Sequence, residues 1–105
     1  MGQDLLMQVE KSVSLTGLGV LLLPAQLLPL LQTYDLHSQW LIHLVFPDGT
    51  ETEAHASVEE ISRPADSVGA VAVETRALLL TEEGAGPVPT GTLVYLMKQQ
   101  DWFIT

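Results

Sequence analysis

The sequence predicts an all-β fold, namely one small antiparallel six-stranded β-barrel, with a β-sandwich as the alternative. Three observations predict it: the apolar runs are short, Gly, Pro, Asp and Ser separate them, and they lack the period of an amphipathic helix. No strand–helix–strand spacing of the kind that builds a parallel sheet is found. The 105 residues are expected to form a single domain over residues 1–105, because domains commonly contain about 100–200 residues.

The first two strands are expected at residues 5–15 and 20–23, joined by a turn at residues 16–19. The first strand alternates, and the second is apolar on both faces, as a buried strand would be. Polar residues occupy one parity of the first strand: Gln8, Glu10, Ser12 and Ser14. Apolar residues occupy the other parity: Leu5, Met7, Val9, Val13 and Leu15.

The next two strands are expected to form a hairpin around Pro47-Asp48-Gly49. A three-residue loop, built as a type I turn followed by Gly in the left-handed region, suits this sequence. Loop length and hydrophobic pattern agree on one register, in which an apolar or small residue faces each apolar residue. The predicted pairs on that face are Phe46–Thr50, Leu44–Thr52, Ile42–Ala54 and Trp40–Ala56, and those on the outward face are His43–Glu53 and Leu41–His55.

The last two strands are expected at residues 71–80 and 92–97. Residues 59–67, which contain Pro64 and Asp66, are expected to form the loop before the fifth strand, and residues 84–91 the connection to the sixth. Residues 98–105 then form a C-terminal tail or an extra edge strand.

Residues 5–19 carry the most specific pattern: an apolar pair, Met7, a Val-Glu step and an apolar segment that ends in Gly17-Leu18-Gly19. This pattern resembles the first strand and turn of domain 2 of elongation factor Tu and related translational GTPases. Residues 54–61 and 88–94 are similar to the fourth and closing strands of that domain. The resemblance implies a stand-alone β-barrel of this type without its GTPase domain. It does not carry over tRNA binding, because residues 23–29 lack Arg and hold two prolines in place of Gly.

The charge balance is strongly acidic, with four Lys and Arg against thirteen Asp and Glu and a formal net charge of −9. Phosphates of nucleic acids and anionic lipids attract Lys and Arg, so the composition disfavours both partners. The N-terminus carries an acid where a signal peptide carries bases, and two prolines interrupt the most apolar stretch, residues 18–31. That stretch is shorter than the about 20 residues of a membrane-spanning helix. We therefore expect no membrane association and a cytoplasmic location.

No pattern predicts catalysis. The chain has no Cys, no phosphate-binding Gly-rich motif and no nucleophile elbow, and Asp35-Leu36-His37-Ser38 is expected to be a polar loop. The paired carboxylates Glu59-Glu60 and Glu82-Glu83 are adjacent and would point to opposite faces of a strand. We therefore predict that the protein is not an enzyme, with no catalytic or cofactor-binding residue, no cofactor and no metal site.

Two apolar segments bear on the function. The C-terminal Trp102, Phe103 and Ile104 either fold back on the barrel or contact a protein partner or a second copy, since Trp is enriched at interfaces. The leucines at positions 27, 28, 30 and 31 belong either to the core or to an exposed patch. We predict a non-catalytic protein-binding or assembly module with the C-terminal trio as its partner contacts. The alternative is a small-ligand or metal-binding barrel around His43, Glu53 and His55.

Overall fold

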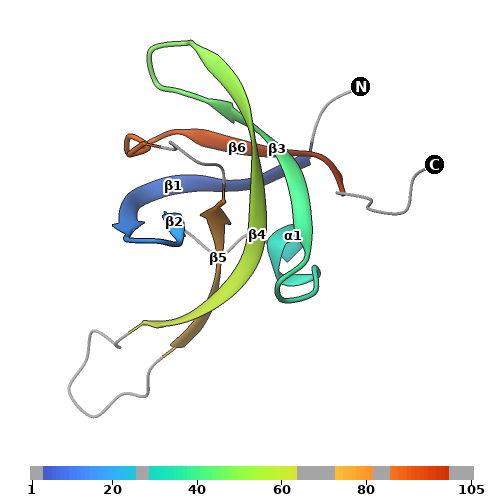
Figure 1. The fold of residues 1–105 in the computed structure, drawn as a ribbon. Coiled ribbons are helices and arrows are strands. Elements are labelled where there is room, and N and C mark those ends of the chain that lie inside the picture. The colour runs from blue at the N-terminus through green and yellow to red at the C-terminus, as the bar shows by residue number, and fades with distance from the viewer. Residues whose placement is uncertain (1–3, 26–28, 64–72, 82–85, 100–105) are drawn as a thin grey trace.

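The strands form a closed barrel in a computed structural model that describes residues 4–25, 29–63, 73–81 and 86–99. All neighbouring strands are antiparallel, in the order β1-β2-β5-β4-β3-β6 (Figure 1). The predicted six-stranded antiparallel barrel is therefore confirmed, and the alternative, a β-sandwich, is wrong. The elements are β1 (Asp4–Leu15), β2 (Gly19–Pro24), the short helix α1 (Pro29–Gln32), β3 (Gln39–Val45), β4 (Glu51–Arg63), β5 (Val73–Leu80) and β6 (Leu93–Gln99).

Strand β1 pairs with two neighbours, and each of its two ladders contains one β-bulge. Its first part pairs with β6 and its second part with β2, and one extra β1 residue stands in each ladder: Leu6 opposite β6, and Glu10 opposite β2. Such β-bulges bend a strand and increase its twist. At the first bulge, two consecutive side chains, those of Leu6 and Met7, are buried in the barrel.

The simple alternation expected for residues 5–15 is therefore wrong. Leu5 is 37% exposed and Val13 is 36% exposed, because the bulges leave both on the outer side of the barrel. Ser12 instead pairs with the buried Leu22, on the inner side. Its hydroxyl donates to the carbonyl oxygen of Val88 at 3.1 Å and accepts from the Val88 N–H at 2.9 Å. The side chain of Val88 is buried, so this end of the barrel is completed by a residue from the β5–β6 connection.

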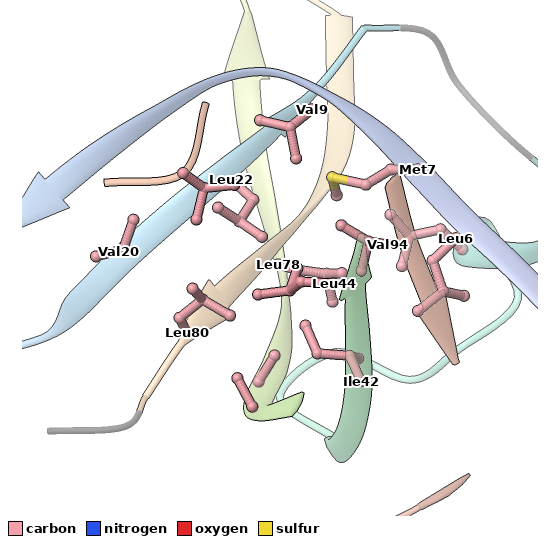
Figure 2. Packing of buried hydrophobic residues seen from close by; sticks show 14 of the residues in the cluster. Leu6, Met7, Val9, Val20, Leu22, Ile42, Leu44, Leu78, Leu80 and Val94 are labelled. Atoms are coloured by element: carbon pink, nitrogen blue, oxygen red, sulfur yellow. The ribbon is translucent and has the colours of Figure 1, made fainter. Parts of the chain in front are cut away.

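The core is one apolar cluster in the barrel interior, where side chains of all six strands meet (Figure 2). Helix α1 contributes the buried Leu31 and the partly buried Leu30, so these two leucines belong to the core. Leu27 and Leu28 lie outside the described residues. Each fully buried aliphatic side chain contributes about 1.5–3 kcal/mol, which identifies this cluster as the main stabilising feature. The strand members of the cluster are Leu6, Met7, Val9, Val20, Leu22, Ile42, Leu44, Ala54, Ala56, Val58, Leu78, Leu80 and Val94.

The predicted β3–β4 hairpin is confirmed in its register. Ladder pairs run from Val45 opposite Glu51 to Gln39 opposite Ser57 and include every predicted pair within the strands. The Phe46 N–H donates to the carbonyl oxygen of Thr50 at 2.8 Å. Gly49 donates its N–H to the carbonyl oxygen of Phe46 at 2.9 Å and has a φ of 94°, as the predicted turn requires.

The loop expected from residue 59 begins later, because β4 continues to Arg63. Its last residues pair with β5 in a two-stranded ribbon that extends away from the barrel (Figure 1). An ion pair between Glu60 and Arg76, 3.5 Å apart, crosses this ribbon. Residues 59–63 contain a single apolar residue, Ile61, and this polar composition made the segment resemble a loop. Strand β6 likewise extends two residues past the expected end, through Gln99.

The turn between β1 and β2 depends on two glycines with positive φ, Gly17 at 80° and Gly19 at 137°. A Cβ atom at Gly19 would lie 1.9 Å from the carbonyl oxygen of Leu80, whereas one at Gly17 would meet nothing within 4 Å. Gly19 thus lets β2 approach the backbone of β5 where the barrel closes, and Gly17 supplies only the turn conformation.

We expect Gly19→Ala to lower the free energy of unfolding by about 2–6 kcal/mol, because a clash with the backbone adds to strain at positive φ. Gly17→Ala is the matched control and should cost about 1–2 kcal/mol, from its φ alone. Urea unfolding followed by circular dichroism measures both. Equal losses in the two variants would contradict the close approach of β2 to Leu80.

The hairpin turn also predicts a pH dependence. Hydrogen bonds from the backbone N–H of Thr50 at 3.0 Å and from its hydroxyl at 2.7 Å lower the pKa of Asp48 below its ordinary value. The ionised form is therefore favoured by folding, and its stabilising effect is present above the unfolded pKa and lost as the pH falls through the folded pKa. The stability difference between wild type and Asp48→Ala should accordingly shrink between pH 6 and pH 2. A constant difference would contradict this account.

Candidate functional site

The main candidate site is an apolar region on the outer side of β6 and β3, bordered by β1. We call it the β6–β3 face. Met97 is 36% exposed and Leu5 is 37% exposed, and the other members are half-buried. It consists of Leu5, Leu41, Val45, Leu93, Tyr95 and Met97, arranged around His43.

The alternation of the two strands creates this face. In β6 the side chain of Val94 fills the barrel, so Leu93 and Tyr95 point outward. In β3 the buried Ile42 and Leu44 leave the odd-numbered residues outside in the same way. Apolar side chains thus occupy both parities, and the outward set has no role in the core.

Three contacts across strands align the rows of this face. Leu5 pairs with Tyr95, which pairs in turn with His43, and Leu93 pairs with Val45. The rings of His43 and Tyr95 meet edge to face with centroids 6.5 Å apart. Met97 is the extra residue where the β3–β6 register shifts, next to the Leu41–Lys98 pair. A bulge of this kind changes the direction of a side chain at a sheet surface, and here Met97 is exposed.

Carboxylates of β4 border the face on the side of β3. Glu53 lies opposite His43 and Glu51 lies opposite Val45. The Nε2 atom of His43 is 2.6 Å from Oε1 of Glu51, so the hydrogen bond goes to the diagonal carboxylate rather than to the one directly opposite. The His43 side chain is 19% exposed and that of Glu51 is 56% exposed. The face therefore has an apolar centre and an acidic border.

A second outward apolar region lies across β1, β2 and β5. It contains Val13 opposite Leu21, which is itself opposite Leu79. Leu18, in the β1–β2 turn, is 64% exposed. Lys11 lies on its β1 side. On its β4 side stand Ser57, opposite Leu79, and Glu59, opposite Ala77, so its border differs from the two successive outward carboxylates Glu51 and Glu53 beside the β6–β3 face.

The Asp35-Leu36-His37-Ser38 segment forms a turn between α1 and β3, and its polar atoms have local partners. The Ser38 hydroxyl donates to the carbonyl oxygen of Asp35 at 2.6 Å and accepts from the indole N–H of Trp40 at 2.7 Å. His37 Nδ1 lies 3.0 Å from Oε1 of Glu59. This arrangement stabilises the turn, and the Ser38 hydroxyl is directed to a carbonyl rather than to an imidazole.

A buried hydroxyl extends the same cluster. Ser57 is buried and donates to Oε2 of Glu59 at 2.8 Å. Its acceptor is a carboxylate and not a histidine nitrogen, so His37 is not placed to remove its proton. The geometry is that of a structural network between β4 and the turn.

The predicted partner contacts Trp102, Phe103 and Ile104 lie outside the described residues. The outward pair of Leu41 and His55 is confirmed by the register. Among the described residues, no group of three or more His, Asp or Glu is placed to hold a metal ion.

Sequence reasoning did not identify the β6–β3 face. Its one available signal was the run from Leu93 to Met97, which is apolar at both parities. Such a run is equally typical of a strand buried on both sides, so the pattern alone does not distinguish an exposed apolar face from a second buried surface.

The chain was compared with models of protein families, with curated proteins and with solved structures, and none of the three comparisons found a match. The resemblance to domain 2 of translational GTPases therefore stays a prediction. Within the described part of the chain, no helix is long and apolar enough to cross a membrane.

The His43–Glu51 pair predicts a result for zinc. A protein zinc site usually takes three or four ligands in fixed geometry, and we expect micromolar zinc to leave the imidazole NMR signals of His43 and His55 unshifted. A His43→Gln variant assigns the signals. A saturable shift of either histidine would contradict the expectation and support the metal-binding alternative.

Proposed function

We propose that the protein is a non-catalytic protein-binding or assembly module that acts through the β6–β3 face. The observation that carries the proposal is the contiguity of six outward apolar side chains next to a row of carboxylates. Protein interfaces commonly have an apolar centre and a polar rim, and contiguous exposed apolar patches mark contact sites. Two of its members, Tyr95 and Met97, are of residue types that are enriched in interfaces.

The barrel architecture favours recognition through side chains. Over residues 93–96, β6 is paired on both sides, with β1 and with β3, so this segment offers no strand edge to which a partner strand is added. Its backbone is held by two ladders and by the core beneath it. A partner would therefore meet a preformed surface, which limits the ordering cost of binding.

The proposal includes four predictions from the sequence. The chain is a barrel of translation-factor domain 2 type, supported by its six strands and by the Gly17–Gly19 turn. It works in the cytoplasm and has no catalytic activity. Trp102, Phe103 and Ile104 add contacts to the partner, since β6, which crosses the face, leads directly into the C-terminal segment.

Two matched substitutions test the proposed face. Leu5 and Val13 both belong to β1 and have nearly the same exposure, 37% and 36%, but they lie on different outward regions. We expect Leu5→Ser to reduce capture of the partner from an extract of the native host about tenfold, a loss of about 1.4 kcal/mol, whereas Val13→Ser leaves it unchanged. Quantitative mass spectrometry of crosslinked, affinity-captured material measures the difference.

Deletion of residues 102–105 is the second arm of this test. It should reduce capture and leave the thermal unfolding midpoint unchanged. A large loss of thermal stability with an unchanged molecular mass would instead show that the segment packs on its own barrel. Equal capture by wild type and Leu5→Ser would contradict the proposed face, and turnover of a substrate by the purified chain would contradict the whole proposal.

A further inference from the structure

We infer that the β6–β3 face binds a cationic, apolar peptide segment of another protein, in which Lys or Arg side chains accompany aliphatic or aromatic ones. This inference rests on the proposed function and goes further by specifying the chemistry of the partner. It is drawn from the charge distribution around the face, from its dimensions and from the pairing of its strands.

On the β4 side, the face is bordered by Glu51 opposite Val45 and by Glu53 opposite His43, and His55 stands opposite Leu41. The carboxylates of Glu51 and Glu53 project from the outward parity of β4, and Asp48 stands in the turn that precedes this strand. Two basic residues in other ladders are remote from this border: Lys11 pairs with Leu23 in β2, and Arg76 pairs with Glu60 across the ribbon. Lys98, at the far end of β6, pairs with Leu41. A cationic group over β4 would therefore meet opposite charge.

His43 links the apolar and acidic parts of the face. Its imidazole contacts the Tyr95 ring on one side and the Glu51 carboxylate on the other. One carboxylate of the border is thus fixed in position by a side chain of the face itself, which pre-orients an acceptor for an incoming cation. Glu53, directly opposite His43 and exposed, extends the acceptor row.

The spacing of the strands suits a long basic side chain that lies on the face. Neighbouring strands lie about 4.8 Å apart, and β3 and β4 are neighbours in the barrel. A Lys or Arg side chain whose aliphatic stem lies over the outward residues of β3 can therefore place its charged group at the carboxylates of β4. Aliphatic or aromatic neighbours in the same peptide would cover Tyr95 and Met97.

Two other occupants fit the face less well. A second copy of this chain would bring an identical acidic border and a net charge of −9 to the contact, and like charges across an interface oppose association. A partner strand added to a sheet edge is excluded along residues 93–96 of β6, because both sides of that segment are already paired. A separate basic segment satisfies both constraints.

The test is peptide display against the immobilised chain of residues 1–105 at low salt. We expect enriched peptides to combine at least two Lys or Arg with apolar residues and to lose affinity as salt rises. A synthetic copy of an enriched peptide should bind Glu51→Gln/Glu53→Gln at least tenfold more weakly than wild type. The matched control, Asp35→Asn/Glu74→Gln, removes the same formal charge at two exposed positions outside the border and should leave affinity within twofold.

The apolar variants separate the inference from the function on which it rests. Leu5→Ser and Met97→Ser should each weaken binding of the synthetic peptide, whereas Val13→Ser should leave its affinity unchanged. Thermal unfolding verifies that all three variants fold. Enriched peptides without basic residues that still depend on Leu5 or Met97 would overturn the cationic partner and leave the proposed function standing. If no peptides are enriched, or if binding is unaffected by Leu5→Ser and by Met97→Ser, the inference and the proposed function are both overturned.

Sedimentation equilibrium tests the second copy as occupant. We expect a monomer at low and high salt. A dimer that Leu5→Ser and Met97→Ser dissociate would show that the face is covered by another copy of the same chain and would overturn the inference.

Discussion

Closure of the barrel through β1 is the constraint on which the rest of the structure depends. This strand pairs with β2 by its second part and with β6 by its first, and both of these ladders are interrupted by a bulge. A single regular strand would pass between these neighbours with difficulty, because closing a small barrel demands strong bending. The two bulges, at Leu6 and Glu10, supply that bend.

The same bulges decide which side chains are inside and which are outside. They place Leu6 and Met7 together in the core and leave Leu5 and Val13 on the outer surface. They also turn Ser12 inward, where the connection before β6 satisfies its hydroxyl through Val88. The exposed apolar surface is thus a geometric consequence of closure as well as of composition, and Leu5 joins Tyr95 on the β6–β3 face for this reason.

The sequence predicted those elements in which short-range signals agree. The β3–β4 hairpin is the strongest case, because the loop Pro47-Asp48-Gly49 and the alternating pattern specify the same register. The alternation predicted for β1 was wrong because its bulges depend on the pairing with β6 and β2, strands that the local sequence of β1 does not describe. The end of β4 was misplaced because the ribbon from Glu59 onward is polar where it leaves the core. The candidate face could not be predicted from the sequence, because the burial of Leu93 or Tyr95 depends on whether another part of the protein covers the outer side of the sheet.

A closed barrel with an apolar outer face has to avoid aggregation. Its pairing removes the free edges of β6 and β3, but the side chains of Met97 and Leu5 stay exposed, and contiguous apolar surface is a general aggregation hazard. The excess of carboxylates offers the remedy, because a net charge of −9 makes copies of the chain repel one another. The Glu51 and Glu53 border concentrates that repulsion next to the apolar surface. One row of charges therefore opposes self-association and would at the same time favour the cationic partner proposed for the face.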